Sequence, residues 1–523
     1  MTSRTFNTEG VCVPSLHYMV DTSAKIGRIV REFIEPGKYF VINRARQFGK
    51  TTTLRLMDKT LSAKFTTLRI SFEGREELFT TQTAFARGFC SLLARTMQSI
   101  SPDIAEWLAE PFTSDLPFAE LSLRISKLCG CIDRDVVLMI DEVDRASDYA
   151  IFMSFLGLLR QMYLDRSDAG DHSTFHSVIL AGVHDIKNLK AKIRPDSEHT
   201  YNSPWNIAAQ FDIDMSFSPY EIASMLNEYE SDYQTGMDVA AVATRIYYYT
   251  DGYPFLVSLF CKRMYDNGYE WSAVGVDQAM RLILKEKNTL FDDIIKNLNN
   301  NKNFSRLIEK IVLTGVRVSF SADNETLDLG IMYGILKEEN DRVQIANVVF
   351  MTRLTYYYVS LSEIAEIVEA RSDSERNLFI KGEVLDMDAV LERFHAFMHE
   401  SYRERDSAFI ESNARLIFTA FLRPIINGKG FCAPEAEVRG ARRIDLSVVY
   451  GWQRDIVELK VWRGEKYEEA GRVQLAGYCK SIGQSKGYLV SFCDLKRDKP
   501  VGGVYVYDGV TIKEVIVAFS DQV

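Results

Sequence analysis

The chain has 523 residues, of which 46% are hydrophobic and 26% charged, and a formal net charge of −10 at pH 7. This length predicts roughly three or four domains, and the composition is typical of a folded globular protein. The negative charge argues against broad, sequence-independent adhesion to nucleic acid. Because no run of 18 or more apolar residues occurs, we expect no membrane span.

The opening segment MTSRTFNTEG lacks the apolar core of a signal peptide. The eight cysteines of the whole chain are scattered, and only Cys129 and Cys131 stand close together. This spacing indicates neither a disulfide framework nor a zinc site. We therefore expect a cytoplasmic protein.

The first chemical motif follows an apolar run that begins at Tyr39 and precedes helix-forming residues 54–61. Strand, polar loop and helix in this order are what a phosphate-binding loop requires, because loop N–H groups and a helix N-terminus then face the anion. Lys50 would reach the β- and γ-phosphates, and Thr51 would offer a hydroxyl to Mg²⁺. The match to GxxxxGK[ST] is partial, since Arg44 replaces the first glycine. The predicted nucleotide-binding residues of this loop are Arg44, Gln47, Phe48, Gly49, Lys50, Thr51 and Thr52.

A second motif lies in residues 136–142, an apolar run that ends in Asp141 and Glu142. The pattern predicts a buried parallel strand with acids at its carboxyl end, where ligands of open α/β sheets bind. Asp141 would hold Mg²⁺, and Glu142 would polarise the attacking water. A core strand followed by an acidic loop is the alternative. Together with Lys50 and Thr51 upstream, however, the motif predicts nucleotide binding.

The remaining periodicities divide the first part of the chain into alternating strands and helices. Residues 68–72 and 177–183 read as strands, and residues 83–100 and 104–128 as amphipathic helices. Alternation of this kind predicts an α/β domain with a parallel sheet. We assign residues 1–215 to a P-loop ATPase domain, which the family resemblance described below implies to be of the AAA type.

The middle of the chain is mainly helical. We predict a helical lid at 216–300, a winged-helix-like region at 301–358 and a helical linker at 359–405. The winged-helix outline rests on helices at 304–314 and 326–336, followed by a strand at 341–347. Few basic residues occupy the second helix, which favours a structural role over DNA binding.

A second chemical centre is predicted in the last domain, residues 406–523. Residues 442–450 and 455–461 alternate as two strands of a hairpin. Glu458 and Lys460 share one face, and Asp445 would join them from the partner strand. Such a group suits Mg²⁺-dependent hydrolysis of a phosphodiester, with Lys460 positioning or deprotonating the nucleophile. The alternative is a half-exposed hairpin with a salt bridge.

Two flanking helices extend this centre. The helix at 409–422 can supply Glu411 as a further carboxylate, and the helix at 467–482 carries Gln474. With a strand at 487–492 the segment becomes a small α/β unit. Residues 406–523 contain 17 Lys and Arg against 15 Asp and Glu, which leaves only a slight positive excess. Only local basic clusters could therefore help this domain bind DNA.

These motifs resemble a bacterial family of predicted AAA-ATPase-like proteins. The resemblance is carried by the stretch from Tyr18 to Lys50, Ile140–Glu142, Gly182–Val183, Ser203–Asn206 and Gly252–Leu256. An arginine at position 44 is normal for that family. The chain departs from the family pattern at three places: Asp21-Thr22-Ser23 lacks a lysine, and Ala45 and Gln47 replace proline and arginine.

Residues 406–492 resemble the PD-(D/E)XK nuclease domain that usually accompanies this family, through Arg443-Ile444-Asp445, Glu458-Leu459-Lys460, Gln474 and Tyr478. The resemblance implies a multidomain α/β protein in which a P-loop NTPase precedes a restriction-endonuclease-like domain. It implies two activities, a P-loop ATPase and a Mg²⁺-dependent nuclease. The catalytic residues would be Glu142, Asp445, Glu458, Lys460 and Gln474, and the metal ligands Thr51, Asp141, Glu411, Asp445 and Glu458.

Our leading interpretation is an ATP-gated nuclease that acts on DNA, in defence against foreign elements. The alternative is an ATP-switched signalling or scaffold protein whose nuclease-like domain only binds nucleic acid or a partner. ATP and Mg²⁺ are the expected cofactors, and ATP and nucleic acid, DNA before RNA, are the expected partners. We expect no membrane partner, and a homo-oligomer is left open.

Overall fold

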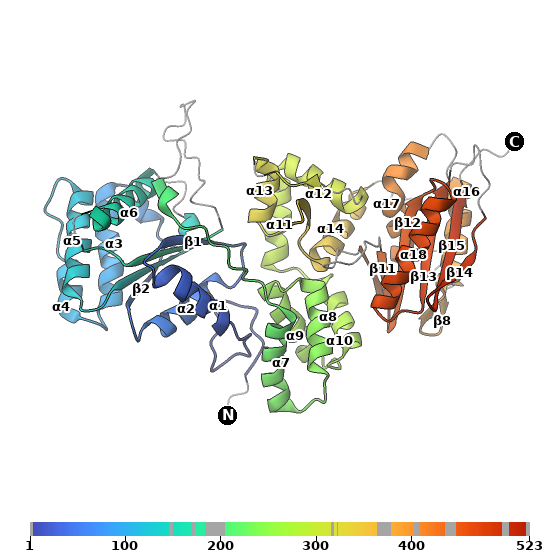
Figure 1. Cartoon of the computed structure of the whole chain (residues 1–523), viewed down its shortest axis with the longest axis horizontal. Coiled ribbons are helices and arrows are strands. Elements are labelled where there is room, and N and C mark those ends of the chain that lie inside the picture. Colours follow the sequence, from blue (N-terminus) through green and yellow to red (C-terminus); the bar gives the residue numbers. More distant parts are fainter. Residues whose placement is uncertain are drawn as a thin grey trace. The chain divides into compact units, whose positions relative to one another are not determined.

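A computed structural model describes the fold of the chain (Figure 1). The described residues are 4–145, 150–168, 173–183, 204–314, 318–321, 323–362, 378–401, 407–434, 446–493 and 501–518. The chain divides into two compact units. The first is residues 1–217 with the short segments 253–255 and 332–334, and the second is residues 218–252, 256–331 and 335–523. Among the described residues, no helix is both long enough and apolar enough to cross a bilayer.

The first unit contains a parallel four-stranded sheet in the order β1-β4-β3-β2. Its strands are β1 (Tyr39–Asn43), β2 (Thr66–Ser71), β3 (Val136–Asp141) and β4 (Ser177–Gly182). Every residue of β3 and β4 is buried, which explains why these strands read as continuous apolar runs. The prediction of a parallel α/β sheet is confirmed.

Helices cover both faces of this sheet (Figure 1). One layer packs α1 (Ser23–Ile29) and α2 (Lys50–Leu61) against Phe40, Ile42 and Met139. The opposite layer packs three longer helices against the other side chains of the strands. These helices are α3 (Gln82–Met97), α5 (Pro117–Cys131) and α6 (Ala150–Asp168).

The single helix predicted for residues 104–128 is two helices. α4 spans Pro102–Leu108, and α5 begins only at Pro117. Proline disfavours a helical conformation of the residue before it and is tolerated in the first turn, so Pro111 and Pro117 break the pattern and Pro117 starts the next helix. Apolar periodicity continued across this break, and that continuity misled the prediction.

The second unit begins with a helical region and a small antiparallel sheet of order β5-β7-β6. The helices are α7 (Pro219–Tyr233), α8 (Val239–Thr250), α9 (Pro254–Asp266), α10 (Ala273–Ile283), α11 (Thr289–Asn300), α12 (Lys302–Thr314), α13 (Glu325–Met332) and α14 (Val348–Ser360). The strands are β5 (Val318–Ser319), β6 (Leu336–Glu339) and β7 (Arg342–Ile345).

The helix predicted for 326–336 is too long, because α13 ends at Met332. Gly334 has a φ of +68°, a left-handed conformation that stops the helix, and β6 follows. Asn340 and Asp341 also have positive φ and form a two-residue turn that pairs β6 with β7. The end of the predicted helix therefore belongs to a hairpin, which begins at Leu336.

The last part of the second unit is a mixed six-stranded sheet in the order β10-β11-β12-β13-β15-β14. β10 to β12 form an antiparallel meander, whereas β12, β13 and β15 run parallel. The strands are β10 (Gly430–Pro434), β11 (Leu446–Tyr450), β12 (Gln453–Val461), β13 (Lys486–Cys493), β14 (Val504–Tyr507) and β15 (Val510–Ala518). The predicted hairpin is confirmed as β11 and β12.

Helix α18 (Glu465–Ser481) packs on one face of this sheet over Ile456, Leu489 and Ile512. Two further helices belong to the same part of the chain, α16 (Met387–Ser401) and α17 (Ser407–Ile426). α17 precedes the meander and contacts β10, β12 and β13.

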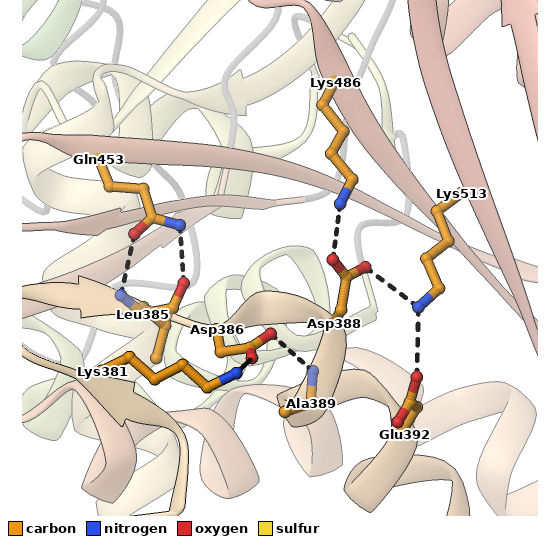
Figure 2. A network of polar contacts seen from close by, with 9 residues as sticks. All are labelled: Lys381, Leu385, Asp386, Asp388, Ala389, Glu392, Gln453, Lys486 and Lys513. Atoms are coloured by element: carbon orange, nitrogen blue, oxygen red, sulfur yellow. Dashed lines mark hydrogen bonds and ion pairs between the residues drawn. The ribbon is translucent and has the colours of Figure 1, made fainter.

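The segment before α16 corrects the prediction of an all-helical linker. It contains a hairpin of β8 (Ile380–Lys381) and β9 (Val384–Leu385), and Gly382 with its φ of +67° makes the turn. Figure 2 shows how polar contacts fasten this segment to the six-stranded sheet. The Gln453 amide bonds both backbone groups of Leu385, and Asp388 of α16 pairs with Lys486 and Lys513. These residues are therefore a layer of the sheet domain.

Candidate functional site

The loop between β1 and α2 surrounds a buried lysine. Lys50 is the first residue of α2, only 8% of it is exposed, and its ammonium donates to the carbonyl oxygens of Arg44 at 2.8 Å and Ala45 at 3.0 Å. Gly49 precedes it with a φ of +78°, a conformation that favours glycine. α2 has no side-chain cap, so its N-terminus can meet an anion.

The carboxylates at the end of β3 reach this loop. The Thr51 hydroxyl donates to Asp141 Oδ2 at 2.6 Å, across 90 residues of sequence. Asp141 Oδ1 accepts the backbone N–H of Glu142 at 3.0 Å, and Glu142 has a φ of +54°. The structure thus brings Lys50, Thr51, Asp141 and Glu142 to one edge of the sheet, as sequence spacing predicted.

Asp144 is a residue of this edge to which the sequence reasoning gave no role. Its carboxylate accepts the backbone N–H of Val183 at 2.7 and 2.6 Å. A Cβ on Gly182 would lie 2.7 Å from Asp144 Oδ1, so only glycine permits this approach. Asp144 therefore ties the loop after β3 to the end of β4. Its place three residues after Asp141 was the available signal, but an acidic loop residue has many other uses.

Other predicted loop residues serve packing in this structure. The Arg44 guanidinium donates to the carbonyl oxygens of Asn43 and Ile213, and Thr52 Oγ1 accepts the N–H of Cys12 at 3.4 Å. Phe48 meets the Tyr253 ring edge-on at 4.8 Å. These contacts hold the outside of the loop.

A hydrogen bond to a backbone carbonyl and an unusual backbone conformation also fix the shape of this loop. The Tyr253 hydroxyl donates to the Arg46 carbonyl at 2.5 Å. Gln47 adopts a φ of +57°. Together with the Phe48 contact, the Tyr253 bond fixes the loop from its outer side, a tertiary role that the sequence did not reveal.

Burial shifts the titration of the central groups. Desolvation lowers the pKa of the Lys50 ammonium, and the carboxylates of Asp144, Glu142 and Asp141 oppose this shift. Desolvation raises the pKa of the Glu142 carboxyl, and the neighbouring Asp141 charge raises it further. A carboxyl with a raised pKa is a better proton acceptor when it is ionised.

The second predicted centre is partly described. Lys460 Nζ lies 3.0 Å from Glu458 Oε1, and their side chains are 13% and 5% exposed. The ammonium also lies 5.0 Å from the centroid of the Tyr467 ring. A Cβ on Gly471 would meet Lys460 Nζ at 2.5 Å, so α18 crosses directly over this lysine. The alternative of a salt-bridged hairpin is correct about the ion pair, but the pair is buried.

A chain of buried charges continues from this pair beneath α18. Glu468 accepts a hydrogen bond from the Ser491 hydroxyl at 2.7 Å, and Arg472 pairs with Glu514 at 2.7 Å. Desolvation raises the pKa of the Glu468 carboxyl, and Glu514 contributes to the same direction. Sequence analysis missed Glu468 because it reads as an ordinary acid in the first turn of a helix.

The other residues predicted for this centre are not assembled by the described structure. Asp445 lies outside the described residues, and Glu411 is placed only as a position in α17. Gln474 is half-buried on α18. Among the described residues, no three His, Cys, Asp or Glu side chains come together as a group able to hold a metal ion.

Comparison with known proteins adds one assignment. A family described as "AAA-like domain" matches residues 10–354, which are 345 of the 523 residues and do not reach the six-stranded sheet. No curated protein matches the chain.

Several solved structures are distantly similar. A Walker-type ATPase of Pyrococcus abyssi is 14% identical with a TM-score of 0.45, covering 67% of this chain and 99% of its own. The Aeropyrum pernix ORC2 protein with ADPNP and ADP is 11% identical with a TM-score of 0.37, over 68% and 98%. The ORC1 protein of the same organism, in complex with DNA, is 11% identical with a TM-score of 0.30, over 65% and 93%. At these values the likenesses assign no function.

Proposed function

The chain belongs to the AAA-like domain family, and we propose that it binds ATP in the loop between β1 and α2 and hydrolyses it there. The observation that carries this proposal is the 2.6 Å hydrogen bond from Thr51 to Asp141 beside the buried ammonium of Lys50. It joins the phosphate-facing loop to the carboxylate edge of the sheet. Residues 90 positions apart form one site.

Lys50 supplies the positive charge of the phosphate site. Its two hydrogen bonds go to neutral carbonyl oxygens, and within the described part of the chain it forms no ion pair, although the charges of Asp144, Glu142 and Asp141 act on it. The N-terminus of α2 adds N–H groups and a positive dipole end at the same place. The loop is therefore arranged to attract an anion, and phosphates are the anions that such loops bind.

Glu142 is the residue that we expect to activate the attacking water. Its unusual backbone conformation is fixed by its N–H bond to Asp141. In its ionised form the carboxylate would orient the attacking water and accept its proton. Its raised pKa strengthens it as a base, at the cost of protonation at a less acidic pH than an exposed glutamate.

The hydroxyl of Thr51 and the carboxylate of Asp141 fit Mg²⁺, because both are hard oxygen ligands and they lie within hydrogen-bond distance of each other. Bound there, Mg²⁺ would neutralise charge on the phosphate oxygens during transfer. The chain's own contribution is to hold these two oxygens together and to keep Lys50 and Glu142 beside them.

The test separates binding from turnover. ATP affinity and ATP hydrolysis are measured on the wild type and on Glu142→Gln, with EDTA as the metal-free reference. We expect Glu142→Gln to bind ATP within about twofold of wild type and to hydrolyse it at least roughly 100-fold more slowly. Hydrolysis by the variant at the wild-type rate would exclude Glu142 from the reaction, and absence of ATP binding by the wild type would overturn the site.

We further propose that the last domain is a metal-dependent nuclease. The element order α17, β10, β11, β12, α18 and β13 supports this proposal, since it is a helix and a meander followed by a helix and a parallel strand. The specific observation is the buried pair of Glu458 and Lys460 on β12. Glu458, with Asp445 and Glu411, would supply oxygen ligands to Mg²⁺, and Lys460 would position the nucleophile. Gln474 would complete the site from α18.

In this proposal the occupancy of the ATP site licenses cleavage of DNA, in defence against foreign elements. DNA and RNA, single- and double-stranded, are incubated with the protein and Mn²⁺ or Mg²⁺, with and without ATP. We expect cleavage that Asp445→Ala abolishes, that Lys50→Ala reduces and that Glu142→Gln retains. Wild-type cleavage by Asp445→Ala would place the nuclease elsewhere, whereas no cleavage by any form would favour the signalling or scaffold alternative.

A further inference from the structure

A pocket of about 450 Å³ lies inside the second unit, between its helical region and the six-stranded sheet domain. Arg281 lies in the last turn of α10 and Lys285 two residues after its end, while Arg353 comes from α14 and Arg423 from α17. Among the described residues that line the pocket, none is acidic. Four cations without a lining carboxylate make this a site for an anion.

The geometry shows how these cations are held. One Arg281 N–H donates to the carbonyl of Lys429 at 2.7 Å, while a guanidinium has five N–H donors in all. Lys285 is exposed and forms no ion pair in the described part of the chain. Arg353 donates to the carbonyls of Ile283 and Leu284 and so covers the negative end of α10.

Two carboxylates lie near the pocket but do not line it, and both act on Arg353 through their charge. Glu286, just after α10, is in an ion pair with Arg263 and is not a lining residue. Asp292 acts on Arg353 through its charge but also does not line the pocket. An incoming anion can therefore approach the Arg281 guanidinium and the exposed Lys285 ammonium, and no described acidic residue lines the pocket beside them.

Three aromatic residues also line the pocket, together with the aliphatic side chains of Leu284, Ile295 and Ile426. Tyr356 and Tyr357 are half-buried neighbours on α14, and Phe431 is a buried residue of β10. The Arg423 guanidinium lies 5.2 Å from the Tyr356 ring centroid, and the Cys432 N–H donates to the Tyr356 hydroxyl at 2.8 Å. These contacts set Tyr356 in place before any ligand arrives. Flat rings beside guanidinium groups suit a planar base next to a phosphate.

We propose that this pocket binds a nucleotide unit, a phosphate with its attached base, at a site distinct from the loop of Lys50. The unit is either a free nucleoside phosphate or one residue of a single-stranded nucleic acid. The volume lies within the usual range for small-molecule sites, whereas inorganic phosphate alone would leave the aromatic wall uncovered. Arg281 and Lys285 would contact the phosphate, and Tyr357 would lie beside the base.

The experiment uses the full chain carrying Lys50→Ala, so that the loop site does not mask the pocket. A fluorescent AMP and a fluorescent 5′-phosphorylated DNA tetranucleotide are titrated in turn, with inorganic phosphate as competitor. The pocket variant is Arg281→Ala with Lys285→Ala. The matched control is Lys302→Ala with Arg306→Ala, one lysine and one arginine that are exposed on α12 and do not line the pocket.

We expect saturable binding of at least one probe, weakened at least tenfold in the pocket variant and by less than twofold in the control. Lys285→Glu, a change at an exposed side chain, should weaken binding in the same direction and covers the case in which the double variant folds poorly. Tighter binding of AMP identifies a free nucleotide, and tighter binding of the tetranucleotide identifies a strand.

Three results would overturn the proposal. Neither probe saturates, the pocket and control variants bind equally, or inorganic phosphate competes as well as unlabelled AMP, which would show that the base is not recognised. The outcome is independent of the ATPase proposal, since residual binding at the loop of Lys50 would not respond to changes at Arg281 and Lys285.

Discussion

Two buried lysines, one in each unit, show how the same ammonium group can be prepared for different roles. Lys50 donates to two neutral carbonyl oxygens at 2.8 and 3.0 Å, and the carboxylates of Asp141, Glu142 and Asp144 act on it only through their charge, without a hydrogen bond among the described contacts. Lys460 instead lies 3.0 Å from the carboxylate of Glu458, which largely cancels its charge. The first arrangement attracts an anion directly. The pair of Lys460 and Glu458 attracts neither an anion nor a cation strongly while the two charges remain in contact. A ligand of either sign must first separate them.

The largest expected effect is the loss of ATP binding when the Lys50 ammonium is removed. Lys50→Ala should weaken ATP binding roughly 100-fold or more, because each lost charge-assisted hydrogen bond to phosphate contributes about 1.5–3 kcal/mol. Calorimetric titration with ATP measures the change. Lys59→Ala, at an exposed position of the same helix, is the control and should bind like wild type. Equal affinity of the Lys50→Ala protein would remove the loop from the nucleotide site.

Breaking the second pair should affect folding first. Glu458→Gln leaves the Lys460 ammonium buried without its carboxylate, which typically costs about 3–5 kcal/mol of unfolding free energy. Denaturant titration measures this loss. The double variant Glu458→Gln with Lys460→Met should recover most of it, since no buried charge remains. If the double variant regains stability but not cleavage, the pair acts in the reaction; if it regains both, the pair is structural.

The second carboxyl group of β12 sharpens the comparison. Asp455 is 9% exposed, and its one side-chain hydrogen bond among the described residues is accepted from the Gln453 amide; burial raises its pKa to about 6. The folded pKa therefore exceeds the unfolded one. The native state holds the proton more tightly, and stability falls as pH rises through about 6. Asp455→Asn should raise the unfolding free energy at pH 8 by up to about 3 kcal/mol.

The same substitution should change nothing below the unfolded pKa, near pH 3.5, where the aspartate is protonated in both states. Unfolding titrations at the two pH values provide the check. A gain of equal size at both would mean that the effect does not come from ionisation. Glu392→Gln, at an exposed position of α16 near Lys513, serves as the carboxyl-to-amide control.

The smallest expected effect is a displacement of the pH profile. Glu142 must be ionised to accept a proton, and its pKa is raised by desolvation and by Asp141. ATP turnover should therefore fall, as pH decreases, at a higher pH than an ordinary glutamate would give. The slow residual turnover of Glu142→Gln should lack this acid limb. An acid limb of the same midpoint in the variant would assign it to another group.

The same comparison shows why one site was more predictable than the other. Lys50 and Thr51 are adjacent in sequence, and Asp141 ends an apolar strand, so local pattern alone indicated each part. Residues far from either motif complete the arrangement. The packing of Tyr253 against Phe48 and the bond of Asp144 to Val183 depend on elements brought together only by folding. No periodicity in the sequence encodes such contacts.

In the last domain β11, β12 and β13 were predicted, whereas β10, β14, β15 and the environment of Glu458 and Lys460 were not. Alternation placed both on one face of β12. It did not reveal that α18 covers this face, with Gly471 directly above the lysine and Glu468 and Arg472 buried nearby. Element ends were also misjudged where single residues decided them, as Pro117 did for α5 and Gly334 for α13.

The sequence by itself determined the strand and helix types, the phosphate-binding loop and the residues that carry its charge, because these depend on local spacing and on the chemistry of individual side chains. Only the tertiary structure decided which charges are compensated. Lys50 bonds to carbonyl oxygens because the loop before α2 curls around its side chain. Lys460 bonds to a carboxylate because Glu458 lies on the same face of β12. The cationic pocket has the same origin, since α10, α14 and α17 meet there from distant parts of the chain.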